Sequence, residues 1–348
     1  MSDGCPMLRI VLLASLALSS AASATEVSKV VSHPAYKGAV AVLDREHERI
    51  VRDIVTLTEI PAPPFQEKAR AAAYLEMLRA AGLSDVEMDA EGNVMGLWRG
   101  TGPAGGPLVA IAAHLDTVFP PETPVKVRRE GTRLLAPGIG DDSRSLAVLL
   151  GYVRAMKAAN VRTARDILFV GNVGEEGPGD LRGVRYLFTK GRYKGRISHF
   201  FSMDGVDGKR IVNAGVGSRR YRVTFKGPGG HSYGAFGLVN PMAAMSQAVV
   251  DLYKLEVPRA PKTTYAASVT GGGTSVNSIP DAVFMEFDMR SVSADALAGL
   301  EKSFLGIVAA AVAGENAARS TREGPVSADP KLIGDRPAGT TVESSALV

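Results

Sequence analysis

Three largely hydrophobic runs precede residue 205, at Leu108–Ala113, Ile167–Val173 and Ile197–Met203. Because their apolar residues follow one another without strict alternation, each run is typical of a strand that is covered on both faces. Apolar residues at helical spacing lie between the runs, near residues 144–159 and 180–190. This order of strands and helices predicts an α/β domain with a mostly parallel sheet and helices on both faces.

Upstream of these strands, apolar residues recur at helical spacing from about residue 42 to residue 83. A Pro-Ala-Pro-Pro segment at residues 61–64 interrupts this pattern. Because proline does not continue a helix interior, we predict two helices around a loop.

After Gly217 the pattern changes to alternation between apolar and polar residues, first around Tyr221–Phe225 and again around Val283–Asp288. Alternation is typical of a sheet with one solvent-facing side. Helical patterns at 240–256 and 293–313 flank these strands. Together they predict a small α+β domain of the order β-α-β-β-α.

These patterns predict two folded domains with a segment at each end. Residues 25–215 form the α/β domain, and residues 216–325 form the α+β domain inserted into it. The polar stretch from Asn316 is rich in Gly, Pro and Ser and predicts no further element. We expect residues 326–348 to return toward the first domain.

The first residues are typical of a signal peptide. Arg9 precedes an apolar run from Ile10 to Leu18, and Ala22-Ser23-Ala24 fits a cleavage site, so residues 1–24 would be removed. A start at Met7 would give a more basic beginning. The alternative is a membrane anchor, but the run is shorter than the roughly 20 residues that span a bilayer. We therefore expect a periplasmic or secreted protein without a stable membrane anchor.

Composition narrows the chemistry that the chain can perform. Lys and Arg number 40 and Asp and Glu 36, and no basic run is long enough for a nucleic-acid surface. Cys5 is the only cysteine and precedes the apolar run, so the exported chain would contain none. A metal site must then use carboxylates and imidazoles, which excludes thiolate sites and suits zinc or manganese.

Residues that bind metal ions follow each of the three buried runs and one glycine-rich turn. They are His114 and Asp116, Glu175 and Glu176, Asp204, and the pair Asp141-Asp142. A single acidic pair before a helix is usually an N-cap, and a single Glu pair is usually a solvated surface. Ligands of open α/β sheets bind beyond the carboxyl ends of the strands, where so many carboxylates would repel one another without a cation. Together they indicate a divalent metal site.

The spacing within these pairs suggests separate roles. His114 and Asp116 lie two residues apart on an extended segment and face the same way, so the Asp116 carboxylate can accept the second N–H of the imidazole. Glu175 and Glu176 are adjacent and diverge. One of them can therefore bind metal while the other accepts a proton from a metal-bound water.

Five segments, in this order and spacing, resemble the di-zinc peptidase and deacylase family that includes glutamate carboxypeptidase, peptidase T, acetylornithine deacetylase and succinyl-diaminopimelate desuccinylase. They are Ala113-His114-Leu115-Asp116-Thr117-Val118, Gly140-Asp141-Asp142, Gly174-Glu175-Glu176-Gly177, Met203-Asp204-Gly205 and Gly229-Gly230-His231-Ser232. The similarity runs from about residue 45 to the end of the chain. It implies hydrolysis of amide bonds in small peptides or N-acyl amino acids.

The resemblance also assigns metal ligands and a base. His114 and Asp204 would hold one zinc ion, Glu176 would help to hold a second, and Asp141 would bridge the two. Glu175 would be the general base, with Asp116 supporting His114. Cobalt or manganese are alternatives to zinc.

In the family, the second domain is a lid that also forms a homodimer. By this resemblance His231 would reach the partner subunit's site and steady the oxyanion. Asn277 and Arg290 match positions that hold the polar end of the substrate. Arg290 is equally well explained as a surface arginine at the end of a strand.

The sequence departs from the family in two ways. The family's last zinc ligand is a histidine beyond the lid, whereas the last histidine here is His231 and the chain ends at Val348. We therefore expect a truncated catalytic domain, and the alternative function is an impaired member that only binds. Family deacylases and carboxypeptidases tend to carry Glu where this chain has Asp204, which favours an aminopeptidase or dipeptidase.

Two glycine-rich segments also fit the motifs of other enzyme families. Gly230-His231-Ser232-Tyr233-Gly234 fits the nucleophile motif of serine hydrolases, but no histidine follows to complete a catalytic triad. Gly100-Thr101-Gly102-Pro103-Ala104-Gly105 fits a dinucleotide-binding pattern, but it precedes a strand and contains proline. Both are better explained as turns.

Overall fold

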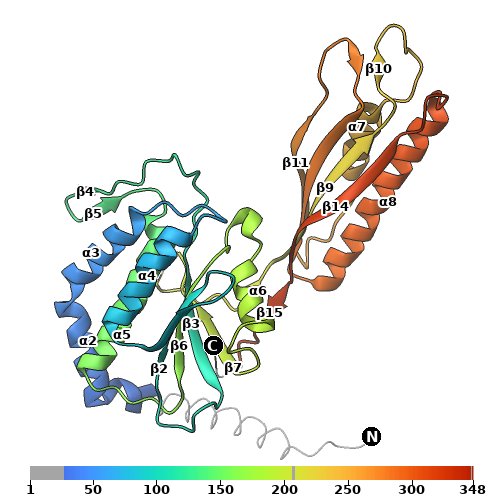
Figure 1. The fold of residues 1–348 in the computed structure, drawn as a ribbon. Helices are drawn as coiled ribbons and strands as arrows, with labels where there is room; N and C mark the ends of the chain where they lie inside the picture. The colour runs from blue at the N-terminus through green and yellow to red at the C-terminus, as the bar shows by residue number, and fades with distance from the viewer. Residues whose placement is uncertain (1–26, 206–207, 346, 348) are drawn as a thin grey trace, which may run out of the picture. The chain divides into compact units, whose positions relative to one another are not determined.

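A computed structural model describes residues 27–205, 208–345 and 347 (Figure 1). The expected signal peptide, residues 1–24, lies outside the described residues. The chain divides between residues 207 and 208 into two compact units, which we describe separately.

The first unit is built on a five-stranded sheet of order β1-β2-β6-β3-β7. Its strands are β1 (Ser84–Met88), β2 (Val94–Trp98), β3 (Leu108–His114), β6 (Ile167–Asn172) and β7 (Ile197–Ser202). The three predicted buried strands are confirmed, and β3 pairs in parallel with β6 and β7. The sheet is mixed: the expected parallel pairing is confirmed for β6, β3 and β7, whereas β2 pairs antiparallel with both β1 and β6. Strand β1 is short and largely polar, so its sequence carries little strand signal.

Helices cover both faces of this sheet. Leu168 and Val170 of β6 pack on one face with Leu187 of helix α6 (Arg182–Thr189), whereas Phe169 packs on the other. The second face carries α3 (His47–Thr58), α4 (Lys68–Ala81) and α5 (Arg144–Ala158), with α2 (Pro34–Arg45) packed against α5. A separate hairpin joins β4 (Arg128–Glu130) and β5 (Arg133–Leu135).

The two helices predicted around a loop are confirmed as α3 and α4, and a further helix, α2, precedes them. Helices α2 and α3 meet at Glu46 without glycine or proline, so the apolar spacing runs through the junction and gives no sign of a break. The predicted loop is present between α3 and α4.

The second unit is an antiparallel four-stranded sheet with two helices. Its strand order is β11 (Thr263–Gly272), β13 (Ala282–Ser291), β9 (Gly217–Lys226) and β14 (Ser327–Arg336). Helices α7 (Pro241–Leu252) and α8 (Ala294–Ala318) pack on one face. By length and composition α8 could cross a membrane, but Leu300 and Phe304 on it are buried in this unit's core.

Strand β14 corrects the expectation for residues 326–348. Instead of returning toward the first domain without any element, residues 327–336 pair antiparallel with β9. The strand is largely exposed and contains Pro330 and Gly334, so neither burial nor alternation reveals it in the sequence. Short pairs complete the unit, namely β8 (Ala214–Gly215) with β15 (Gly339–Thr340) and β10 (Gly230–His231) with β12 (Ser278–Ile279).

Two buried polar side chains fix the ends of the first unit's strands. Arg70 on α4 donates to the carbonyl oxygens of Ile60 and Leu115, and burial lowers its pKa to about 10. Asn93 accepts from the backbone N–H of Val173 at 3.1 Å and donates to the carbonyl of Gly183 at 2.9 Å. These bonds hold the segments on which the acidic residues lie.

We expect Asn93→Ala to lower the free energy of unfolding by about 2–3 kcal/mol, because the N–H of Val173 and the carbonyl of Gly183 lose a buried partner. Urea denaturation followed by circular dichroism measures this change. Asn213→Ala is the matched control, because Asn213 bonds to Thr341 at an exposed site. Equal stability of the two variants would contradict this role for Asn93.

Candidate metal centre

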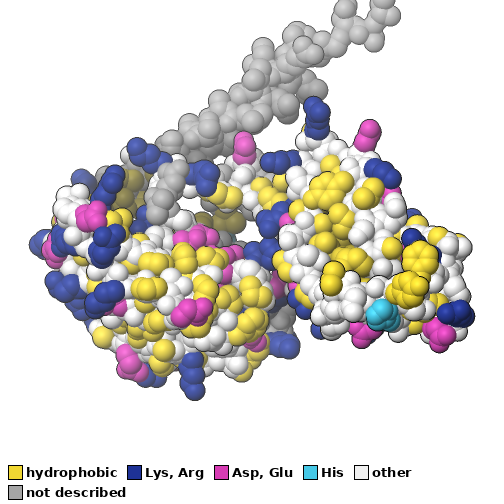
Figure 2. Space-filling view, turned by 90° about the horizontal axis from the view of Figure 1, so that it is seen from above, with side chains coloured by type: hydrophobic (Ala, Val, Ile, Leu, Met, Phe, Trp, Pro, Cys, Tyr) yellow, Lys and Arg dark blue, Asp and Glu magenta, His cyan; other side chains and the backbone are white. Residues whose placement is uncertain are grey.

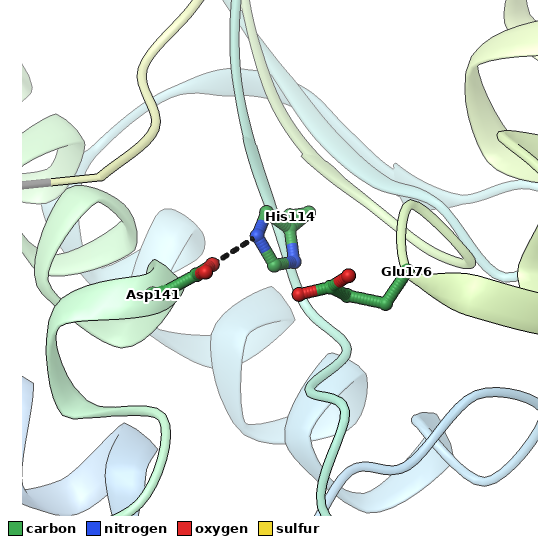
Figure 3. A group of neighbouring side chains, drawn as sticks. All are labelled: His114, Asp141 and Glu176. Carbon is green, nitrogen blue, oxygen red and sulfur yellow. Dashed lines mark hydrogen bonds and ion pairs between the residues drawn. The ribbon is translucent and has the colours of Figure 1, made fainter. Parts of the chain in front are cut away.

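Three side chains from distant parts of the sequence meet at one edge of the first unit's sheet. His114 ends β3, Glu176 follows β6, and Asp141 lies in the short turn η1 (Ile139–Ser143) that leads into α5. One ligand atom from each lies within 4.8 Å of the others. Figure 3 shows the two carboxylates on opposite sides of the imidazole. These are three of the four predicted metal ligands.

The imidazole of His114 is held through both ring nitrogens. Its Nε2 lies 2.7 Å from Oδ1 of Asp141, and its Nδ1 lies 2.9 Å from the backbone carbonyl oxygen of Asp116. The Asp116 carboxylate is farther away, at 3.6 Å. The expectation that this carboxylate fixes the imidazole is therefore corrected: the carbonyl does so, because the carboxylate is engaged elsewhere.

The Asp116 carboxylate holds the segment that contains the two glutamates. Its oxygens accept the backbone N–H groups of Glu175 at 3.0 Å and Glu176 at 2.8 Å. Burial opposes ionisation, but the nearby imidazole and these two N–H groups keep the pKa of Asp116 below its usual value. A single buried carboxylate thus links the end of β3 to the segment after β6.

The electrostatics of this group favour positive charge. Burial lowers the pKa of His114, but Asp116 and Asp141 outweigh burial and raise it to about 11. The pKa of Glu176 is raised by burial, by Glu175 and by Asp141. In the metal-free protein a proton on the imidazole offsets the carboxylates. A divalent cation would offset them more fully, and the oxygen and imidazole donors suit zinc or manganese.

Asp142 lies behind this group and is fully buried. Its Oδ2 accepts the backbone N–H of His114 at 3.0 Å, while Oδ1 has no hydrogen-bond partner among the described residues. Burial raises the pKa of Asp142 to about 7. The two neighbouring aspartates therefore lie in different environments: Asp141 contacts the imidazole ring of His114, and Asp142 accepts its backbone N–H.

The other predicted site residues lie outside the group. Asp204 is exposed after β7 and near enough to raise the pKa of Asp142, but it is not one of the three clustered ligands. In the second unit His231 lies in β10, and Asn277 accepts the backbone N–H of Ser232. Arg290 in β13 pairs with Asp288 on the same strand, at 2.7 Å.

Sequence reasoning missed the positively charged side chains that support the site. Arg182 binds Glu67 at 2.7 Å and Glu91 at 2.8 Å. It also packs so closely on Gly174 that a Cβ there would lie 2.5 Å from it. Arg70 shares a helical face with buried Tyr74. This helical spacing is the sequence signal that indicates burial of Arg70.

Residues 110–328 match the model of peptidase family M20/M25/M40. The chain belongs to this family. Succinyl-diaminopimelate desuccinylase from Burkholderia multivorans is 28% identical over 250 residues, which cover 65% of this chain. The match spans 64% of that relative, so this chain covers less than two thirds of its length.

Solved structures of the family have the same fold. Aminopeptidase PepT from Bacillus cereus aligns with a TM-score of 0.65 and 20% identity, over 86% of this chain and 79% of that one. A dinuclear metal-binding peptidase of family M20 from Bacillus subtilis aligns with a TM-score of 0.60 and 18% identity, over 86% and 77%. The family expected from the motifs is thereby confirmed, and the solved structures confirm the general fold.

We expect zinc binding to release a proton, because the metal-free imidazole of His114 is protonated well above neutral pH. The apparent affinity should rise about tenfold per pH unit from about pH 6 to 8, as fewer protons compete for the ligand. Calorimetric titration in buffers of different ionisation enthalpy measures both effects. His114→Ala should bind weakly without this dependence, and a pH-independent affinity of the wild type would contradict the assignment.

We expect Asp116→Asn to weaken zinc binding by about 10–100-fold, as is typical for residues that orient metal ligands. The amide cannot accept both backbone N–H groups as well as the carboxylate does. Zinc competition against a fluorescent chelator measures the affinity. Asp329→Asn, an exposed change on β14, is the control. Wild-type affinity in Asp116→Asn would show that the segment does not depend on this carboxylate.

Proposed function

We propose that this chain hydrolyses amide bonds of small peptides or N-acyl amino acids with the help of bound divalent metal ions, with zinc as the expected ion. The observation that carries the proposal is the convergence of His114, Asp141 and Glu176 within 4.8 Å. Membership of a peptidase family supports it. Asp204 is proposed as a further ligand.

Each residue has a part in this proposal. His114, Asp141 and Glu176 would hold metal, which when bound supplies an acidified water and polarises the amide carbonyl. Glu175 would accept the proton of that water and deliver it to the leaving amine. Asp116 supports this role because it holds the backbone N–H of Glu175.

The second unit is proposed to contribute to substrate binding. His231 would donate to the oxyanion from a lid that also forms a homodimer, and Asn277 and Arg290 would hold the polar end of the substrate. For Arg290, the pair with Asp288 would have to open. Export through a signal peptide at residues 1–24 completes the proposal and makes extracellular or periplasmic peptides the natural substrates.

The second candidate is a member of the family that binds metal without turnover. The observation that favours it is that the described cluster contains one imidazole and does not include Asp204. The two candidates differ in metal content and rate. Two bound zinc ions with turnover support the enzyme, whereas one ion without turnover supports the binding protein.

We expect Glu175→Gln to lower kcat about 10²–10⁴-fold, the usual range for loss of a general base, while zinc affinity is retained. Glu176→Gln is the matched comparison, because removing a ligand should weaken zinc binding as well as the rate. Steady-state kinetics and zinc titration on the same samples separate the two roles. Equal loss of zinc affinity in both variants would show that Glu175 is a ligand.

A panel of dipeptides, tripeptides and N-acyl amino acids tests the substrate class. The names of the relatives point to both classes, since one is a desuccinylase and another an aminopeptidase. We expect higher kcat/KM for di- and tripeptides because Asp204 stands where the family's deacylases tend to carry Glu. A preference for the acyl substrates would overturn the peptidase assignment.

A further inference from the structure

Three large apolar side chains at one tip of the second unit face solvent almost completely. The exposed fraction is 89% for Tyr233, 89% for Phe236 and 102% for Val276. All three belong to the loops that flank the short β10–β12 pair. Figure 2 shows hydrophobic side chains gathered on the surface of this unit. Exposed apolar groups that gather in one place are typical of binding surfaces.

Hydrogen bonds bring these loops together. Ser232 donates its backbone N–H to the carbonyl of Asn277 at 2.9 Å. The backbone N–H of Ala235 donates to the carbonyl of His231 at 2.8 Å and closes the turn that contains Tyr233. This turn needs Gly230, whose φ is +141° and where a Cβ would lie 2.8 Å from Ala235. The apolar side chains are therefore presented by a defined backbone.

Two polar groups on the same tip complement the apolar ones. Nδ1 of His231 accepts the backbone N–H of Tyr233 at 3.3 Å and of Gly234 at 3.4 Å, which leaves the ring proton on Nε2. The Oδ1 of Asn277 accepts from Ser275, so its amide N–H groups remain as donors. The tip thus offers donors for a carbonyl or carboxylate beside an apolar surface.

We propose that Tyr233, Phe236 and Val276 form an apolar clamp, which selects peptides or N-acyl amino acids with a large apolar side chain. An amino acid with a large apolar side chain matches the tip in two ways. Its carbonyl can accept from His231 and Asn277, and its side chain can pack on the exposed apolar residues. The inference rests on the proposed function and names the substrate class within it.

The size of the tip favours a small ligand over a protein. A stable protein interface takes roughly 20–30 residues on each side, whereas only three large apolar side chains are exposed on these loops. No described side chain of the tip adds charge that would recruit a charged partner, apart from Asp281 at its base.

The kinetic test compares matched leucyl and glycyl substrates, namely Leu-Ala with Gly-Ala, Ala-Leu with Ala-Gly, and N-acetyl-leucine with N-acetyl-glycine. For the wild type we expect higher kcat/KM with leucine. In Phe236→Ala the ratio of leucine to glycine should fall roughly tenfold, the amount expected when about half of a buried apolar contact is lost. Val276→Ala should lower the ratio by a smaller factor.

The control is Val250→Ala on α7, where the same methyl groups are removed from another exposed valine. Its ratio should equal that of the wild type. An unchanged ratio in both Phe236→Ala and Val276→Ala would overturn the clamp. A change in oligomeric state by light scattering without a change in the ratio would show that the tip binds protein, and would also overturn it.

A binding measurement separates this inference from the proposed function. Phe236→Trp places an indole at the tip, and its emission is measured against the wild type, whose single tryptophan is Trp98. A blue shift with leucyl but not glycyl compounds supports the clamp even if no substrate is hydrolysed. If the emission shifts but no substrate is hydrolysed, only the proposed function is overturned. An equal response to both compounds overturns the clamp whether or not the chain is active.

Discussion

The arrangement of the candidate metal centre depends on one buried carboxylate. Asp116 lies two residues beyond His114, which ends β3, and it accepts the backbone N–H groups of both glutamates that follow β6. The backbone of the same residue fixes the imidazole. One residue therefore sets the spacing between an imidazole and two carboxylates that lie some sixty positions apart in the sequence. A carboxylate fits this position because its two oxygens can accept one N–H group each. It has no N–H of its own that would need an acceptor.

Much of the fold, and the meeting of His114 and Glu176, follow from the pattern of hydrophobic residues in the sequence. The continuous hydrophobic runs identify β3, β6 and β7, and strands that run in parallel must bring His114 and Glu176 to the same edge. Alternation identifies β9 and β13 equally well. In each case a local pattern is tied to burial, which is why it can be seen in one sequence without any relatives.

The parts that could not be predicted depend on partners far away in the chain. Strand β14 is exposed and is held by its pairing with β9, so its own residues give no pattern. The carbonyl of Asp116 bonds to His114 because its carboxylate is occupied by Glu175 and Glu176, and side-chain spacing cannot reveal a backbone contact. The helical position of Arg70 indicates burial, but its partners are the carbonyls of Ile60 and Leu115 on other segments, which the position cannot reveal. The location of Asp204 outside the cluster likewise depends on the loop after β7.

The exposed loops around β10 and β12 have an evolutionary consequence. Side chains such as Tyr233 and Phe236 bury almost nothing within the chain, so replacing them costs little folding free energy. Residues of the metal centre have no such freedom, because Asp116 and Asp142 are fully buried within a hydrogen-bonded network. Mutation can therefore alter the proposed substrate preference at the loops while the buried hydrogen-bonded network stays intact. Families built in this way are expected to diverge in what they recognise much faster than in how they react.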